Sequence, residues 1–124
     1  EKSNYGRMKK IYQLNNCNTC QKILKEWKAP KDFEVINIKE KNIPAADLDF
    51  AAKKAGSYEA LFSRRAIKFR SEGWNLKTLS EKDYRKLILS EYTFLKRPVM
   101  INGDEVFAGN SKAVVAAAKK SFKK

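Results

Sequence analysis

The sequence predicts an α/β fold in which two strand-bearing halves flank a helical segment. Three observations support this prediction. β-prone apolar stretches occur at about residues 8–14, 33–37 and 99–108, and apolar residues recur at helical spacing between about 44 and 91. The two cysteines of the chain stand where the first strand gives way to a helix. At 124 residues the chain can bury one core, so we expect a single domain over residues 8–120.

The first half reads as a strand, a helix and a second strand. The first strand begins near Met8, and the paired asparagines that end it are typical of a turn. A helix is expected over residues 18–28 and is ended by Pro30. Its apolar face consists of Ile23, Leu24 and Trp27. Residues 33–37 alternate like a second strand, and a right-handed crossover makes the two strands parallel.

The middle of the chain reads as helical. Pro44 suits the first position of a helix, and Gly56 interrupts the segment. A further short helix is expected at residues 57–62. Ser80 is placed to cap another helix, with an acidic residue three positions later that completes a capping box. Residues from about 44 to 92 are therefore expected to form an all-helical insertion.

The last part reads as a hairpin followed by a helix. The pair Asn102-Gly103 is a strong hairpin signal between two β-prone stretches. Asn110 or Ser111 then caps a final helix.

The order βαβ, helical insertion, ββα is the layout of a thioredoxin-like fold with a mixed four-stranded sheet. Such folds have a cis-proline opposite the cysteines, at the start of the third strand, and Pro98 stands at that place. Residues 1–7 precede Met8, which resembles a natural start, so we expect them to be disordered or foreign to the fold.

Composition excludes several classes of protein. The absence of histidine excludes Cys–His and Ser–His catalysis within the chain. Two cysteines alone cannot form a structural zinc site, so we expect no metal, although a site shared between subunits stays open. No apolar run approaches the roughly 18–20 residues that span a bilayer, and no secretory signal is evident. We therefore expect no membrane association and a cytoplasmic location.

The net charge of +13 has two interpretations. It could serve an acidic partner, or it could be a solvated basic surface. The lysines are scattered over every segment, which favours the solvated surface. No motif supports direct nucleic-acid binding, so we do not expect it.

The stretch Cys17-Asn18-Thr19-Cys20 is the strongest functional signal. The free N–H groups at a helix start favour a thiolate, and two cysteines three residues apart can exchange thiols for a disulfide. Two buried structural cysteines are the alternative interpretation. The position between strand and helix favours redox chemistry.

At these residues the chain resembles the glutaredoxin-coupled arsenate reductase (ArsC) family, which includes the bacterial transcription regulator Spx. The resemblance covers about residues 9–118. It rests on the motif at 16–20, the insertion residues 62–65, the segment 95–98 and the strand end at 106–109.

The resemblance implies a role for each matching residue. Cys17 is the nucleophile, and Arg65 (or Arg64, if the alignment shifts by one) and Arg97 bind an oxyanion. Guanidinium groups suit this role because a thiolate and an oxyanion repel each other. Thr19 and Pro98 are placed in the same candidate anion-binding site. Thr19 either bonds the Cys17 sulfur or satisfies the helix end.

Two functions follow from the resemblance. One is a thiol-dependent reductase of an oxyanion or disulfide, with no bound cofactor and with glutathione or glutaredoxin as reductant. The other is a redox-sensing regulator that binds RNA polymerase. Members that reduce arsenate well have arginines where this chain has Gln21 and Gly109, whereas Cys20 matches the second cysteine of the regulator's switch.

Overall fold

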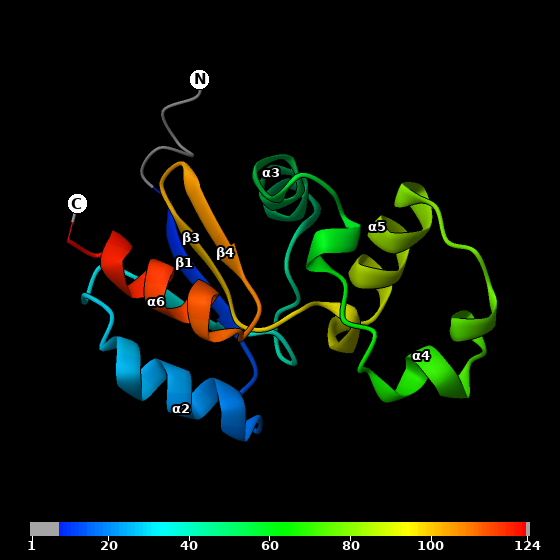
Figure 1. Ribbon diagram of the computed structural model, residues 1–124, viewed down its shortest axis with the longest axis horizontal. Coiled ribbons are helices and arrows are strands. Elements are labelled where there is room, and N and C mark those ends of the chain that lie inside the picture. Colours follow the sequence, from blue (N-terminus) through cyan, green and yellow to red (C-terminus); the bar gives the residue numbers. More distant parts are fainter. Residues whose placement is uncertain (1–7, 124) are drawn as a thin grey trace.

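The computed structural model describes residues 8–123 and has an α/β fold around one four-stranded sheet (Figure 1). The expectation for residues 1–7 lies outside the described residues. The strands are β1 (Lys9–Gln13), β2 (Glu34–Asn37), β3 (Val99–Asn102) and β4 (Glu105–Ala108). The helices are α2 (Asn18–Trp27), α3 (Ala45–Ala55), α4 (Ile67–Ser71), α5 (Glu81–Ser90) and α6 (Lys112–Ser121). Three short 3₁₀ turns are η1 (Glu59–Leu61), η2 (Trp74–Leu76) and η3 (Tyr92–Phe94).

The sheet has the order β2-β1-β3-β4 and is mixed, as the sequence predicted. β1 pairs in parallel with β2, which fits the predicted crossover through α2. β1 and β3 are antiparallel, with Ile11 opposite Met100 and Tyr12 opposite Val99. β3 and β4 form the predicted hairpin.

The two faces of the sheet have different coverings, because successive strand residues point to opposite sides. On one face Ile11 and Met100 pack with α2 and α6, and the Trp27 indole N–H donates to the carbonyl of Val115 at 3.0 Å. On the other face Tyr12 packs with the insertion, which contains every helical element between β2 and β3, α3 among them (Figure 1). The two central strands, β1 and β3, are therefore covered on both faces of the sheet.

A polar cluster fixes α3 to the sheet. The Tyr12 hydroxyl donates to Asp47 at 2.5 Å, and the Lys10 ammonium lies 3.0 Å from the same carboxylate oxygen. Burial and the hydrogen bond to Asp47 both raise the pKa of Tyr12. The phenol therefore stays a donor to the buried carboxylate.

The predicted caps are present. The Ser80 hydroxyl accepts from the backbone N–H of Asp83, and the Asp83 carboxylate accepts from the N–H of Ser80, which completes the capping box of α5. Ser111, rather than Asn110, caps α6 by accepting from the N–H of Val114.

The hairpin turn lies one residue later than predicted. Asn102 pairs with Glu105, so the loop residues are Gly103 and Asp104. The Asn102 side chain instead donates to the carbonyl and hydroxyl of Ser121, which keeps this residue at the end of β3. Gly103 takes the positive φ of 61°.

The insertion is tied to the segment that enters β3. The N–H of Ser63 donates to the carbonyl of Phe94 at 2.7 Å, and the N–H of Lys96 donates to the carbonyl of Leu61 at 2.8 Å. The rings of Phe62 and Phe94 stack with centroids 5.1 Å apart. These contacts fix the chain immediately before β3.

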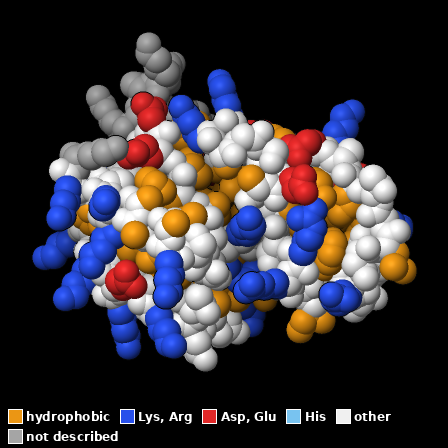
Figure 2. Space-filling view, viewed as in Figure 1, with side chains coloured by type: hydrophobic (Ala, Val, Ile, Leu, Met, Phe, Trp, Pro, Cys, Tyr) orange, Lys and Arg blue, Asp and Glu red, His pale blue; other side chains and the backbone are white. Residues whose placement is uncertain are grey.

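Among the described residues, no helix has both the length and the apolar character to cross a membrane. Lysine and arginine side chains are scattered over the visible face, on the sheet half and on the insertion alike, with fewer carboxylates among them (Figure 2).

Candidate active site

Cys17 occupies the N-terminal cap position of α2. Its backbone has extended geometry, with φ −102° and ψ 113°, so the helix begins at the next residue. Its N–H donates to the carbonyl of Leu14, and its own carbonyl accepts from the N–H of Gln21, each at 3.1 Å. The thiol is free and partly exposed, and it packs toward the core on the insertion side of the sheet. The backbone therefore holds the sulfur at an accessible helix N-terminus.

The sheet topology brings the start of β3 to the same place. Because β1 and β3 are antiparallel and Tyr12 pairs with Val99, the chain enters β3 at the edge where β1 ends. Pro98 is buried here, and the Arg97–Pro98 peptide is cis, at the position that the fold predicted. Arg97 and Cys17, 80 positions apart in the chain, meet at this edge.

The surroundings of Cys17 favour its thiolate. Partial burial alone raises the pKa, but the backbone N–H of Cys20, the Cys20 thiol and the Arg97 guanidinium together outweigh it, so the pKa of Cys17 is lowered. The lowering therefore comes from donors and charge that act on the ionised sulfur.

Cys20 has the opposite properties. Its side chain is fully buried, and burial raises the pKa of its thiol to about 11, with a further contribution from the nearby Cys17. Cys17 therefore ionises more readily, and the Cys20 thiol stays protonated and can donate a hydrogen bond to the Cys17 sulfur.

Arg97 is held by the backbone just before β3. Its Nη1 donates to the carbonyl of Thr93 at 3.1 Å and to that of Leu95 at 3.2 Å. These two bonds account for both hydrogens of Nη1, and they leave the Nε and Nη2 groups for the Cys17 sulfur and for an anion. Sequence reasoning did not identify Thr93, because its contribution is a backbone carbonyl that no residue pattern encodes.

The structure separates the two insertion arginines by their partners. Arg64 lies 2.7 Å from the Glu59 carboxylate and 2.8 Å from the Tyr84 hydroxyl. Arg65 is exposed and has no ion pair within residues 8–123. Arg64 and Arg65 line a surface hollow beside α4 together with Arg70. Arg65 is therefore the one available to an anion, and its role stays a prediction.

Thr19 lies two residues after Cys17, within the first turn of α2. It lines a groove with Asn110 and Lys112 at the start of α6, whereas Cys17 packs toward the insertion. Its role in anion binding stays a prediction without support from this geometry.

Gly109 has a local reason to be glycine. Its φ is +98°, and its N–H donates to the carbonyl of Pro98 at 3.0 Å. An arginine here would be strained in this backbone conformation, which residues with a Cβ rarely adopt. An arginine at this position, which the resemblance associates with arsenate reduction, would therefore be strained in this chain.

The alkylation of Cys17 is expected to follow its lowered pKa. Thiolate reacts and thiol does not, so the rate should rise with pH through a midpoint below that of a free cysteine, which lies at ~8.5. Near neutral pH, peptide mass spectrometry after limited iodoacetamide treatment should find the label on Cys17 and not on buried Cys20. A midpoint at or above the free value would contradict the site electrostatics.

The fold and the cysteine-bearing helix start define a thioredoxin-like α/β protein. A model of the ArsC family matches residues 12–118, and the chain belongs to that family. No curated protein matches the sequence.

Solved structures with the same fold include three bacterial proteins. A putative ArsC family related protein from Bacteroides fragilis has a TM-score of 0.75 at 19% identity, covering 94% of this chain and 98% of its own. A putative arsenate reductase from Yersinia pestis has a TM-score of 0.72 at 12% identity, covering 88% of this chain and 98% of its own. A protein from Staphylococcus aureus has a TM-score of 0.68 at 27% identity, covering 89% of this chain and 97% of its own.

Proposed function

We propose that the protein is a thiol-dependent reductase that uses Cys17 as its nucleophile. The observation that supports this best is the Cys17 sulfur at the N-terminus of α2, next to the Arg97 guanidinium, with its pKa lowered. Family membership supports a reductase in general terms. The substrate in this proposal is an oxyanion or a disulfide, and glutathione, alone or with glutaredoxin, is the reductant.

Two reactions fit the site. With a disulfide, the Cys17 thiolate attacks one sulfur, the other sulfur leaves as a thiolate, and Cys17 is left in a mixed disulfide. With an oxyanion, the Cys17 thiolate bonds to the central atom and displaces one oxygen, which takes up two protons and leaves as water. A glutathione thiolate then attacks the Cys17 sulfur, the bond between that sulfur and the central atom breaks, and the central atom keeps both electrons and is reduced, while Cys17 and glutathione are left as a mixed disulfide.

Arg97 has a defined task in either reaction. Its Nη1 is held by two carbonyls, so its remaining N–H groups are directed rather than free to rotate. In this proposal they stabilise the Cys17 thiolate before the attack and the oxygen charge that develops during it. Arg65 is the candidate second anion ligand, from the insertion.

Arsenate is not the favoured substrate. Gln21 stands where arsenate-reducing relatives have an arginine, and it is engaged with the buried Gln13 side chain at 3.1 Å and the Leu14 carbonyl at 3.2 Å. Gly109 replaces another arginine. Two of the expected anion ligands are thus absent from the site.

A redox-sensing regulator is the second candidate. The contact between the Cys17 and Cys20 thiols supports it, because two neighbouring sulfurs could form a switch disulfide. In that case the reduced and oxidised forms would differ in their affinity for RNA polymerase, and turnover would be low.

A turnover panel tests the proposal. The reduced protein is assayed with arsenate and with a low-molecular-weight disulfide, each with glutathione alone and with glutathione plus glutaredoxin, and Cys17→Ser is the control. We expect catalytic turnover with at least one acceptor and none for the control. Stoichiometric oxidation without turnover, together with redox-dependent binding to purified RNA polymerase, would instead establish the regulator.

A further inference from the structure

Arg97 depends on a short turn for its position. Both of its backbone acceptors, the carbonyls of Thr93 and Leu95, belong to η3 or to the residue that follows it. No carboxylate pairs with Arg97 among the described residues. Whatever fixes η3 therefore also fixes the guanidinium beside Cys17.

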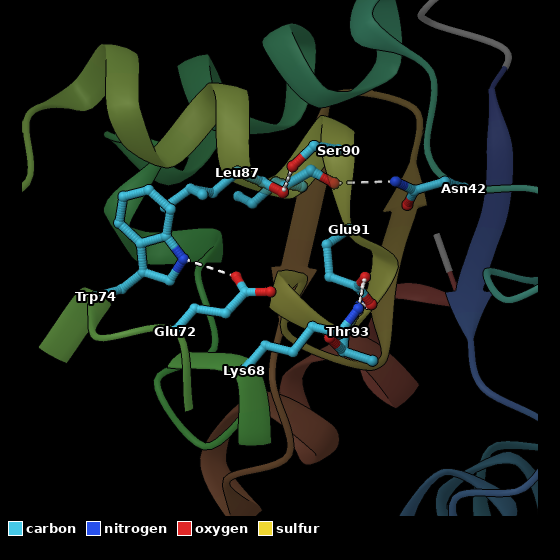
Figure 3. A network of polar contacts seen from close by, with 9 residues as sticks. Asn42, Lys68, Glu72, Trp74, Leu87, Ser90, Glu91 and Thr93 are labelled. Atoms are coloured by element: carbon cyan, nitrogen blue, oxygen red, sulfur yellow. Dashed lines mark hydrogen bonds and ion pairs between the residues drawn. The ribbon is translucent and has the colours of Figure 1, made fainter. Parts of the chain in front are cut away.

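Glu91 fixes the start of this turn. One of its carboxylate oxygens, Oε2, accepts from the Thr93 hydroxyl at 2.9 Å and from the Thr93 backbone N–H at 3.3 Å. The other, Oε1, lies 2.7 Å from the Lys68 ammonium, which approaches from α4. Figure 3 shows the Glu91 carboxylate beside Thr93, with Lys68 close to both and with Glu72 and Trp74 in a separate pair nearby.

The Glu91 carboxylate is held in its ionised form. Burial acts to raise its pKa, but Lys68 and the two Thr93 donors outweigh this effect, and the pKa is lowered. Its side chain is only 18% exposed, so solvent screens these contacts less than at the open surface. Charge-assisted hydrogen bonds of this kind are the stronger ones.

The rest of η3 is fixed by the core and does not need Glu91. Phe94 is buried against Phe62, and the backbone around it is bonded to residues 61 and 63. Thr93 lies on the outer side of the turn, where Glu91 is its hydrogen-bond partner. Loss of Glu91 should therefore loosen the Thr93 carbonyl and leave the fold in place.

We propose that Glu91 is a positioning residue for Arg97: its carboxylate holds Thr93, and the Thr93 carbonyl holds the guanidinium against the Cys17 sulfur. This inference rests on the proposed roles of Cys17 and Arg97. It adds the end of α5, where Glu91 lies, to the residues that shape the candidate active site, although Glu91 touches neither cysteine.

The direction in which the Cys17 pKa changes distinguishes a positioning role of Glu91 from a purely electrostatic one. Removal of a negative charge makes the surroundings more positive, which would lower the pKa of Cys17 and speed its alkylation. Loss of the Arg97 position would raise that pKa and slow alkylation. Glu91→Ala therefore gives opposite results under the two explanations.

The experiment measures the pH profile of iodoacetamide alkylation at Cys17. We expect Glu91→Ala to shift the midpoint upward and to slow the reaction about three- to tenfold near neutral pH. Glu91→Gln keeps an oxygen acceptor for Thr93 and should recover part of the rate. Glu72→Ala is the matched control, because it removes the same charge from the same insertion, where Glu72 accepts from Trp74 at 2.9 Å.

A double variant tests whether Glu91 acts through Arg97. In an Arg97→Met background, Glu91→Ala should cause no further change. If Glu91→Ala does not fold, Thr93→Val, which removes only the hydroxyl donor, takes its place with the same expected direction.

The outcomes separate this inference from the proposed function. An unchanged or faster rate in Glu91→Ala, with a slower rate in Arg97→Met, would overturn the role of Glu91 and leave that of Arg97 intact. An unchanged rate in Arg97→Met would overturn both roles. Because alkylation requires no substrate, a failed turnover panel would leave a positive result for Glu91 standing.

Discussion

Replacement of Arg97 by lysine is expected to lower kcat/KM by about a hundredfold, the size of effect seen when a directed donor to a developing oxyanion is lost. Lysine keeps the positive charge but has no planar guanidinium. It cannot donate to the Thr93 and Leu95 carbonyls and still present further N–H groups to the sulfur and to an anion. The fall in kcat/KM should therefore come from the lost position of the N–H donors, because the charge is conserved.

The thermal midpoint of Arg97→Lys should stay close to that of the wild type. Arg97 is only partly buried and has no carboxylate partner among the described residues, so the fold loses hydrogen bonds to two backbone carbonyls but no ion pair. Arg85→Lys is a matched control, because Arg85 forms a forked pair with Asp49 away from the cysteines. Equal activity of Arg97→Lys and wild type would show that Arg97 does not bind the reacting anion.

Replacement of Cys20 by serine is expected to trap a mixed disulfide. If Cys20 resolves the intermediate, oxidised glutathione should leave the variant with a stable adduct on Cys17. The wild type should clear the same adduct through an internal Cys17–Cys20 disulfide. Intact-mass and peptide mass spectrometry distinguish the two products, and Cys17→Ser, which has no nucleophile, should form neither.

The raised pKa of Cys20 does not prevent this role. Burial is the largest cause of the raised pKa, and the hydrogen bond to Cys17 and the Cys17 charge add to it. Once Cys17 is bound in a mixed disulfide, its charge and its role as acceptor are gone, so the Cys20 pKa should fall. The resolving thiol thus becomes more reactive at the step that needs it.

The internal disulfide also needs a small movement. Cys20 is fully buried in the first turn of α2, and a disulfide requires the two Cα atoms within about 7 Å and suitably aimed side chains. If oxidised wild type carries only the glutathione adduct and never the internal bond, Cys20 does not resolve, and a single-cysteine mechanism replaces this one.

Local sequence patterns determined most of the secondary structure and half of the site. The short apolar stretch of β1, the capping box at Ser80 and the strand–helix junction at Cys17 are set by residues within a few positions of one another. Short-range hydrogen bonds and side-chain periodicity decide such features, so they can be read without the fold. The resemblance to a family added the expected place of Arg97.

The tertiary structure decided what lies around the sulfur. Arg97 reaches Cys17 only because β1 and β3 are antiparallel neighbours, and Thr93 and Glu91 act through a turn that closes against the insertion. The later position of the hairpin loop follows from the contact of Asn102 with the distant Ser121. These contacts join residues far apart in the chain, and several involve backbone carbonyls that every residue has. No local pattern can therefore distinguish them, and only the packed fold makes them specific.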